Sequence, residues 1–150
     1  MSKHITTSEK QTIALGKKIA SGLKDGEVLA LTGDLGAGKT TLIKGIAQGL
    51  GIKKIITSPT FVLMKVYQVN SPKASRRGVI YIRQFVHIDC YRTKSPQEIV
   101  DIGADEYFGD KNTVVVIEWA EKIKKILPRQ TKKILLELGN NQNTRIINIT

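Results

Sequence analysis

The sequence predicts a protein of the α/β class, and three features lead to this prediction. Residues 28–32 form an apolar run of the length of a buried strand, and after a glycine-rich stretch residues 41–50 space apolar side chains as one helix face does. Residues 113–117 are a β-branched run without polar alternation, which is typical of a central parallel strand. Residues 61–69 and 79–88 are strand-like and are predicted to pair antiparallel.

The remaining elements are predicted in order along the chain. A helix begins near Ser8, where hydroxyl groups can cap it, and Glu9 either serves this cap or touches the base or ribose of a nucleotide. The other predicted elements are a polar hairpin loop over residues 70–78, a helix in two pieces from residue 95 to 108 that breaks near Gly103, a short helix over residues 119–127 stopped by Pro128, and closing strands at 132–138 and 144–150. At the tip of the hairpin loop, Arg76 and Arg77 either meet a phosphate or a partner, or are simply solvated.

Length and composition predict one soluble domain spanning residues 1–150. No apolar run approaches the roughly 20 residues of a membrane span, and the N-terminus lacks the apolar core of a signal peptide. Cys90 is the only cysteine, so no internal disulfide can form, which suits a reducing compartment. We therefore expect a cytoplasmic protein without a membrane association.

The chain is strongly basic, with 24 Lys and Arg residues against 13 Asp and Glu and a formal net charge of +11. This balance suits either attraction to nucleic acid or an acidic partner, or an ordinary solvated, lysine-rich surface. Aromatic residues make up only 5% of the chain, and no RNA-binding signature is present, so the charge alone does not indicate an RNA-binding module.

Residues 33–40, GDLGAGKT, fit the phosphate-binding pattern G-x-x-x-x-G-K-[ST] at every fixed position, between a strand and a helix as the pattern requires. Glycines let successive backbone N–H groups curl around phosphate oxygens, and the helix that follows points its N-terminal N–H groups at the same anion. Lys39 can reach the β- and γ-phosphates, and the Thr40 hydroxyl can ligate Mg²⁺. The predicted nucleotide-binding residues here are Gly33, Asp34, Leu35, Gly36, Ala37, Gly38, Lys39 and Thr40.

Two acids at predicted strand ends are the candidates for the chemistry that follows binding. Glu118 comes directly after an apolar strand, which is the Walker B arrangement, and the alternative is an ordinary exposed acid. Asp89 either orients the attacking water, binds Mg²⁺ through a water or holds a turn. Ser58-Pro59-Thr60 lies where a switch segment could approach the γ-phosphate, whereas His87 is expected to be structural and Cys90 a bystander. The chain has no [NT]-K-x-D guanine-reading sequence, which favours ATP over GTP.

Four motifs together resemble a known family. GDLGAGKTT at residues 33–41, SPTF at 58–61, HIDCYR at 87–92 and IEWAE at 117–121 occur in the order and at about the separations of the bacterial TsaE (YjeE) family, the ATPase of tRNA threonylcarbamoyladenosine biosynthesis. The resemblance covers most of the chain. It implies a P-loop NTPase-like three-layer α/β sandwich whose mostly parallel central sheet has an antiparallel part.

The resemblance also implies a function and partners. Members bind ATP, ADP and Mg²⁺ and hydrolyse ATP weakly. They work with the threonylcarbamoyl-transferase subunit and its non-catalytic paralogue, which modify adenosine 37 of tRNAs that read ANN codons. Any contact of this chain with tRNA is expected to be indirect.

Carried over by motif position, the resemblance assigns roles to individual residues. Thr40 and Glu118 would hold Mg²⁺, and Lys39 with the backbone from Gly36 to Thr41 would hold the phosphates. Asp89 would act near the γ-phosphate, which makes Lys39, Asp89 and Glu118 the predicted catalytic residues. Residues 58–61 and 87–92 would be two switches. Trp119 would lie beside the nucleotide, with a core tryptophan as the alternative.

Two other functions remain open on the sequence. One is a small-molecule kinase that transfers the γ-phosphate to a metabolite, and the other is a nucleotide-gated binding module in which hydrolysis is incidental. The residue 70–78 loop is longer than the family's usual hairpin tip, so its role is not assigned by the resemblance.

Overall fold

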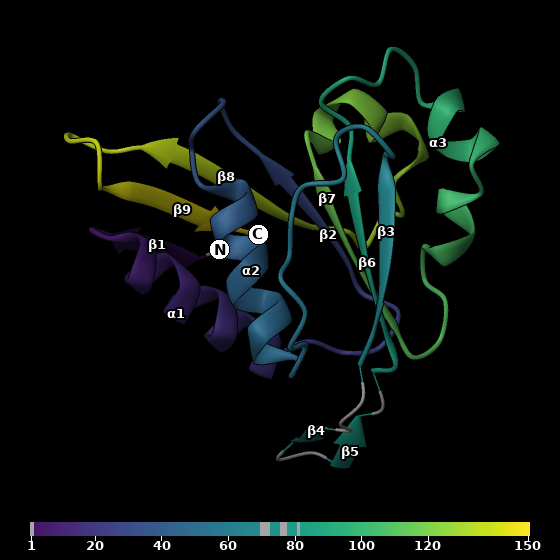
Figure 1. The fold of residues 1–150 in the computed structure, drawn as a ribbon, viewed down its shortest axis with the longest axis horizontal. Helices are drawn as coiled ribbons and strands as arrows, with labels where there is room; N and C mark the ends of the chain where they lie inside the picture. The colour runs from purple at the N-terminus through teal and green to yellow at the C-terminus, as the bar shows by residue number, and fades with distance from the viewer. Residues whose placement is uncertain (1, 70–72, 76–77, 81) are drawn as a thin grey trace.

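The computed structural model describes residues 2–69, 73–75, 78–80 and 82–150, and it has a seven-stranded sheet with helices on both faces (Figure 1). The strand order is β1-β9-β8-β2-β7-β6-β3. The elements of this sheet and its helices are β1 (Ser2–Thr6), α1 (Glu9–Ser21), β2 (Val28–Thr32), α2 (Lys39–Gly49), β3 (Met64–Gln68), β6 (Gln84–Asp89), α3 (Gln97–Asp101), η1 (Ala104–Tyr107), β7 (Thr113–Glu118), η2 (Ala120–Ile126), β8 (Lys132–Leu138) and β9 (Arg145–Ile149). No helix in these ranges has the length and apolar character needed to cross a membrane.

The centre of the sheet is parallel and both of its edges are antiparallel. β2 pairs in parallel with β7 and β8, and β7 pairs in parallel with β6. β3 pairs antiparallel with β6, and β8, β9 and β1 form the antiparallel part at the other edge. The predicted α/β class, its mostly parallel centre and the antiparallel pairing of β3 with β6 are confirmed.

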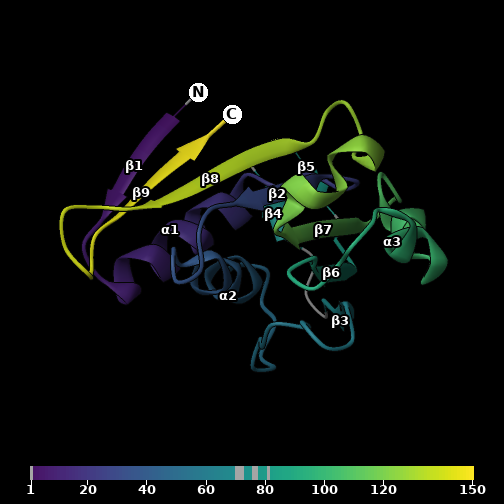
Figure 2. The same ribbon diagram turned by 90° about the horizontal axis from the view of Figure 1, so that it is seen from above.

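Two hydrophobic cores lie on the two faces of the sheet, so the molecule has three layers (Figure 2). Val114 and Val116 of β7 pack on the side of α1 and α2, whereas Val115 and Ile117 pack on the side of α3, η1 and η2. This two-sided burial explains why β7 reads as a continuous apolar run instead of an alternating one.

Helices α1 and α2 touch through glycine. A Cβ added at Gly45 of α2 would lie 2.3 Å from the Ile13 carbonyl oxygen of α1, and one added at Gly16 of α1 would lie 2.5 Å from the Leu42 carbonyl oxygen of α2. Only glycine allows the two backbones to approach so closely. The contact fixes α1 beside the helix that follows the glycine-rich loop.

The helix ends agree with the sequence patterns. The Ser8 hydroxyl accepts a hydrogen bond from the Gln11 N–H at 3.2 Å and caps α1. Gly103, at φ 69°, separates α3 from η1 as predicted. The predicted helix over residues 119–127 is the 3₁₀-helix η2, and Trp119 lies outside it with φ 58°.

Three strand predictions need correction. β1 was not predicted, because its five residues pair with β9, which is remote in sequence. The strand expected from residue 61 begins only at Met64, since Leu63 has φ 61° and turns the chain. The strand expected over residues 79–88 is divided into β5 (Gly78–Ile80) and β6.

A small two-stranded sheet overlaps the predicted hairpin loop over residues 70–78 and extends beyond it to Ile80. β4 (Lys73–Ser75) pairs antiparallel with β5, separately from the main sheet. Residues 70–72, 76–77 and 81 lie outside the described residues, and so does the expectation that Arg76 and Arg77 meet a phosphate or a partner.

Candidate nucleotide-binding site

The glycine-rich loop joins the end of β2 to the start of α2, and its shape depends on glycine. Gly33 has φ 136°, and a Cβ there would lie 2.1 Å from the Leu136 carbonyl oxygen. Gly38 has φ 97° and is the N-cap of α2 without a side-chain cap. The first N–H groups of α2 therefore have no side-chain capping acceptor, which is the arrangement that binds anions at helix N-termini.

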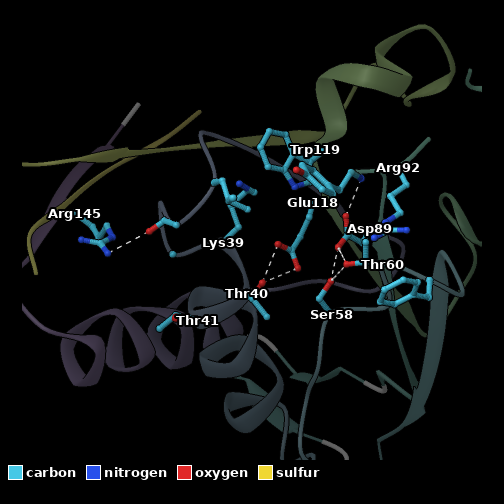
Figure 3. A pocket seen from close by; sticks show the side chains of 15 residues that line it. Lys39, Thr40, Thr41, Ser58, Thr60, Asp89, Arg92, Glu118, Trp119 and Arg145 are labelled. Atoms are coloured by element: carbon cyan, nitrogen blue, oxygen red, sulfur yellow. Dashed lines mark hydrogen bonds between the residues drawn. The ribbon is translucent and has the colours of Figure 1, made fainter. Parts of the chain in front are cut away.

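A cavity of about 440 Å³ lies against this loop (Figure 3). It is lined by residues of the loop, α2 and four other segments: Leu35, Gly36, Gly38, Lys39, Thr40, Thr41, Ser58, Thr60, Phe61, Asp89, Tyr91, Arg92, Glu118, Trp119 and Arg145. A second cavity of about 250 Å³ shares Gly38, Thr41 and Arg145 with the first and is also lined by Ser8, Glu9, Thr12 and Asn143. The two cavities therefore adjoin across the start of α2.

Lys39 is the cation at the centre of the loop. Its Nζ donates to the carbonyl oxygens of Gly33 at 2.6 Å and Asp34 at 2.9 Å, and the residue is only 4% exposed. Burial lowers the pKa of Lys39 below its usual value, and the negative charge of Glu118 opposes this shift most strongly. The Nζ also lies 3.9 Å from the centre of the Trp119 ring, in a cation–π contact.

Thr40 and Glu118 lie in direct contact, although 78 residues separate them in the sequence (Figure 3). The Thr40 hydroxyl lies 3.1 Å from Oε1 and 3.0 Å from Oε2 of Glu118. On its other side, Glu118 Oε1 lies 2.8 Å from Nε2 of the buried His87. The Glu118 carboxylate thus sits between α2 and β6, at the carboxyl end of β7.

The donor set at this point fits Mg²⁺. Thr40 and Glu118 offer hydroxyl and carboxylate oxygens, which are the hard ligands that this ion prefers. Within the described ranges no group of three or more His, Cys, Asp or Glu side chains could hold a metal ion. A cation here would therefore need ligands from water and phosphate as well, and Mg²⁺ is commonly bound in that way.

Asp89 connects the 58–61 segment to the sheet. Its Oδ2 accepts hydrogen bonds from the hydroxyls of Ser58 and of Thr60, the latter at 2.7 Å, and its Oδ1 accepts the Tyr91 N–H at 2.8 Å. The register of β6 and β7 pairs Asp89 with Glu118, so both acids end neighbouring strands. The two acids therefore lie at one edge of the sheet, as predicted.

Aromatic and cationic side chains surround these acids. Trp119 has the left-handed backbone conformation and lies 5.1 Å from the Tyr91 ring, centre to centre. The Arg92 guanidinium lies 4.3 Å from the centre of the Phe61 ring, which joins the 87–92 segment to the 58–61 segment. Lys122 of η2 donates from its Nζ to the Tyr91 carbonyl oxygen.

The structure brings the predicted site residues together in three positions. Leu35, Gly36, Gly38, Lys39, Thr40, Thr41, Asp89, Glu118 and Trp119 line the larger cavity. Glu9 lines the second cavity, while the cap of α1 is made by Ser8. Gly33, Asp34 and Ala37 do not line either cavity; the carbonyl oxygens of Gly33 and Asp34 accept hydrogen bonds from Lys39.

Several residues that line the cavities, Arg145 and Asn143 among them, were not indicated by any sequence pattern. Arg145 of β9 was not predicted, yet its Nη2 lies 3.2 Å from the Gly36 carbonyl oxygen. His87 is expected from the sequence to be structural, and it lies fully buried outside the cavity lining, where it contacts Glu118; its position two residues before Asp89, on the same face of β6, is the sequence signal for this contact. Cys90 is buried away from the cavity lining, and burial raises its thiol pKa to about 12, which agrees with a bystander.

A family model and two relatives of known name all relate this chain to the same family of proteins. The family model "Threonylcarbamoyl adenosine biosynthesis protein TsaE" matches residues 6–147. A Bacillus subtilis protein named tRNA threonylcarbamoyladenosine biosynthesis protein TsaE is 39% identical over 141 residues, which cover 94% of this chain and 80% of that protein. A Treponema pallidum protein of the same name is 38% identical over 143 residues, covering 95% of this chain and 96% of the relative.

A solved structure resembles the fold over almost the whole chain. The crystal structure of Bacillus subtilis YdiB superposes with a TM-score of 0.77 at 34% sequence identity, covering 99% of this chain and 83% of that one. The family match spans both strand-end acids and the glycine-rich loop. The chain therefore belongs to the TsaE family.

Proposed function

We propose that this protein is an ATP-binding and ATP-hydrolysing accessory protein of the complex that forms N6-threonylcarbamoyladenosine at position 37 of tRNAs reading ANN codons. Its relatives in B. subtilis and T. pallidum are named for this biosynthesis. The observation that carries the proposal is the contact of Thr40 with Glu118 at the mouth of a glycine-rich loop, because it joins a phosphate-binding element to a carboxylate suited to Mg²⁺.

The two adjoining cavities suggest how a nucleotide would be divided between them. The N–H groups at the start of α2 and the Lys39 ammonium would hold the phosphates, beside the larger cavity. Glu9 and Asn143 in the second cavity would face the nucleoside, and Arg145 lies between the two. We favour ATP because the sequence lacks a guanine-reading motif.

The reaction proposed is weak, Mg²⁺-dependent hydrolysis of ATP to ADP and phosphate. Thr40 and Glu118 would hold Mg²⁺, which when bound neutralises charge on the phosphate oxygens. Asp89 would orient the attacking water, and the Ser58 and Thr60 hydroxyls fix its carboxylate at the cavity wall. Lys39 would compensate the negative charge that develops on the transferred phosphoryl group.

The partners proposed are the threonylcarbamoyl-transferase subunit and its non-catalytic paralogue, in the cytoplasm. The 58–61 and 87–92 segments would report the nucleotide state to them, since both segments line the cavity and touch each other through Arg92 and Phe61. Phe61 is 82% exposed, so it is available to a partner. Contact with tRNA is proposed to be indirect.

Calorimetry and a pull-down test this function. Purified protein should bind ATP and ADP with Mg²⁺, Lys39→Ala should lose that binding, and the γ-phosphate should appear as free phosphate without an acceptor. The two partner subunits should be retained differently in the presence of ATP and of ADP. No heat with either nucleotide would refute the proposal, and a phosphorylated metabolite would indicate a kinase instead.

A further inference from the structure

We infer that His87 is a positioning residue that holds the Glu118 carboxylate against the Thr40 hydroxyl and so prepares the pair for a divalent cation. This inference rests on the proposed function, because it concerns the cation that accompanies the nucleotide. It assigns a role to a side chain that the proposed reaction does not otherwise use.

The strand geometry places His87 behind the site instead of inside it. Phe85, His87 and Asp89 are every second residue of β6 and so share the face of the sheet that α2 covers. Asp89 lies at the strand end beside Glu118. His87 is one pleat deeper and fully buried, and it does not line the larger cavity. It can therefore act on a bound ligand only through another residue.

The contact between the ring and Glu118 is well defined. His87 Nε2 lies 2.8 Å from Glu118 Oε1, and the side chains are 0% and 5% exposed. A carboxylate can only accept hydrogen bonds, so Nε2 carries the hydrogen and donates it. Such a bond to a charged acceptor in a buried setting is stronger than a neutral one.

The second ring nitrogen of His87, Nδ1, makes no hydrogen bond to the described residues, although it is buried. A buried polar atom without a partner is unfavourable, and an apolar ring such as phenylalanine would avoid this penalty. In the described part of the chain, the polar contact that the ring makes is with Glu118, and we infer that this contact is its contribution.

The hydrogen bonds divide the two oxygens of Glu118 unequally. Oε1 lies within hydrogen-bond distance of both His87 Nε2 and the Thr40 hydroxyl, whereas for Oε2 the Thr40 hydroxyl is the one such neighbour in the described ranges. His87 thereby fixes the rotation of the carboxylate and leaves Oε2 with more free acceptor capacity. Removing an outer hydrogen-bond partner of a metal-binding group typically weakens metal affinity by 10- to 100-fold.

The experiment compares His87→Phe, His87→Gln and a control, Phe85→Leu. Phenylalanine fills the space without a donor, while glutamine can place an amide N–H close to the position of Nε2. Phe85 is buried on the same face of β6 and makes no hydrogen bond to Glu118, so its variant reports on packing alone. ADP affinity is measured by calorimetry in EDTA and over a series of free Mg²⁺ concentrations, with thermal unfolding in parallel.

The midpoint is the free Mg²⁺ concentration that gives half of the full change in ADP affinity. We expect His87→Phe to raise this midpoint by about 10- to 100-fold, while ADP affinity in EDTA changes by less than about threefold. His87→Gln and Phe85→Leu should both stay within about threefold of the wild-type midpoint. An unchanged midpoint in folded His87→Phe, or an equal shift in Phe85→Leu, would overturn the inference. So would wild-type protein that binds ADP without any effect of Mg²⁺.

A measurement on the ring itself covers the case in which His87→Phe does not fold. The ¹⁵N spectrum of wild-type protein should show the His87 ring with its hydrogen on Nε2, and Glu118→Gln should shift that resonance. A ring protonated at Nδ1 alone, or a resonance insensitive to Glu118→Gln, would overturn the inference. Wild-type protein that binds neither ATP nor ADP would instead count against the proposed function, and the spectrum would still decide the hydrogen bond.

Discussion

The contact between α1 and α2 predicts that Gly45→Ala destabilises the protein, although alanine is the better helix former. The added Cβ would lie 2.3 Å from the Ile13 carbonyl oxygen, where ordinary contact begins at 3.4 Å, and the nearby atoms are all backbone. The helices would have to separate by about 1 Å, and because no flexible side chain can give way, we take the upper part of the usual overpacking cost, about 2–3 kcal/mol. Better helix propensity returns about 1 kcal/mol at most.

We therefore expect a net loss of about 1–2 kcal/mol, or a fall in Tm of about 2–8 °C for a chain of this size. Urea unfolding followed by circular dichroism measures it. Gly22→Ala is the control, because the nearest atom to its added Cβ is 3.7 Å away and its stability should change by less than about 0.5 kcal/mol. Nucleotide affinity should fall as well in Gly45→Ala, since α1 brings Glu9 and Thr12 to the second cavity. A Gly45→Ala protein at least as stable as wild type would refute the reasoning.

Three further predictions concern the site. Glu118→Ala should lower ATP turnover by about 100-fold or more, measured as phosphate release, and undiminished turnover would remove Glu118 from the mechanism. The double variant Ser58→Ala/Thr60→Ala removes the two hydroxyls that donate to Asp89 Oδ2. ATP turnover should therefore fall by about 10- to 100-fold, while calorimetry finds ADP affinity unchanged. Equal losses of turnover and of ADP affinity would contradict a positioning role. Burial lowers the pKa of Lys39 in the folded protein below the value of 10.5 expected in the unfolded chain. Between the folded pKa and the unfolded pKa, the unfolded chain binds more protons than the folded protein, so the free energy of unfolding rises with pH. Lys39→Met should lose that part of the rise in urea unfolding across alkaline pH, and a profile parallel to wild type would contradict the shift.

The parts of the fold that could be predicted from sequence are those whose cause is local. The glycine-rich loop, the Ser8 cap and the β-branched run of β7 each depend on neighbouring residues and are confirmed. The order of strand, loop and helix then placed Thr40 correctly at the start of α2. The acids Asp89 and Glu118 were found because each follows a strand, and parallel strands end at one edge.

The parts that could not be predicted depend on residues far apart in sequence. β1 exists because it pairs with β9, and a five-residue run of mixed polarity does not signal this by itself. Arg145 reaches Gly36 across 109 positions, so no pattern near either residue indicates their contact. The role inferred for His87 likewise depends on Glu118, 31 positions further along the chain, and on a hydrogen bond that spacing alone does not reveal.

The pairing of β1 with β9 has a consequence for how the chain is made. β1 can pair within the main sheet only once β9 has been synthesised, since Ser2 pairs with Ile149 and, among the described residues, β1 pairs with no other strand (Figure 1). Arg145 belongs to β9 and lines both cavities, so the wall between them is also incomplete until this strand has been made. Until β9 has been made, the nascent chain therefore lacks both the strand that pairs with β1 and the Arg145 side chain of the candidate site.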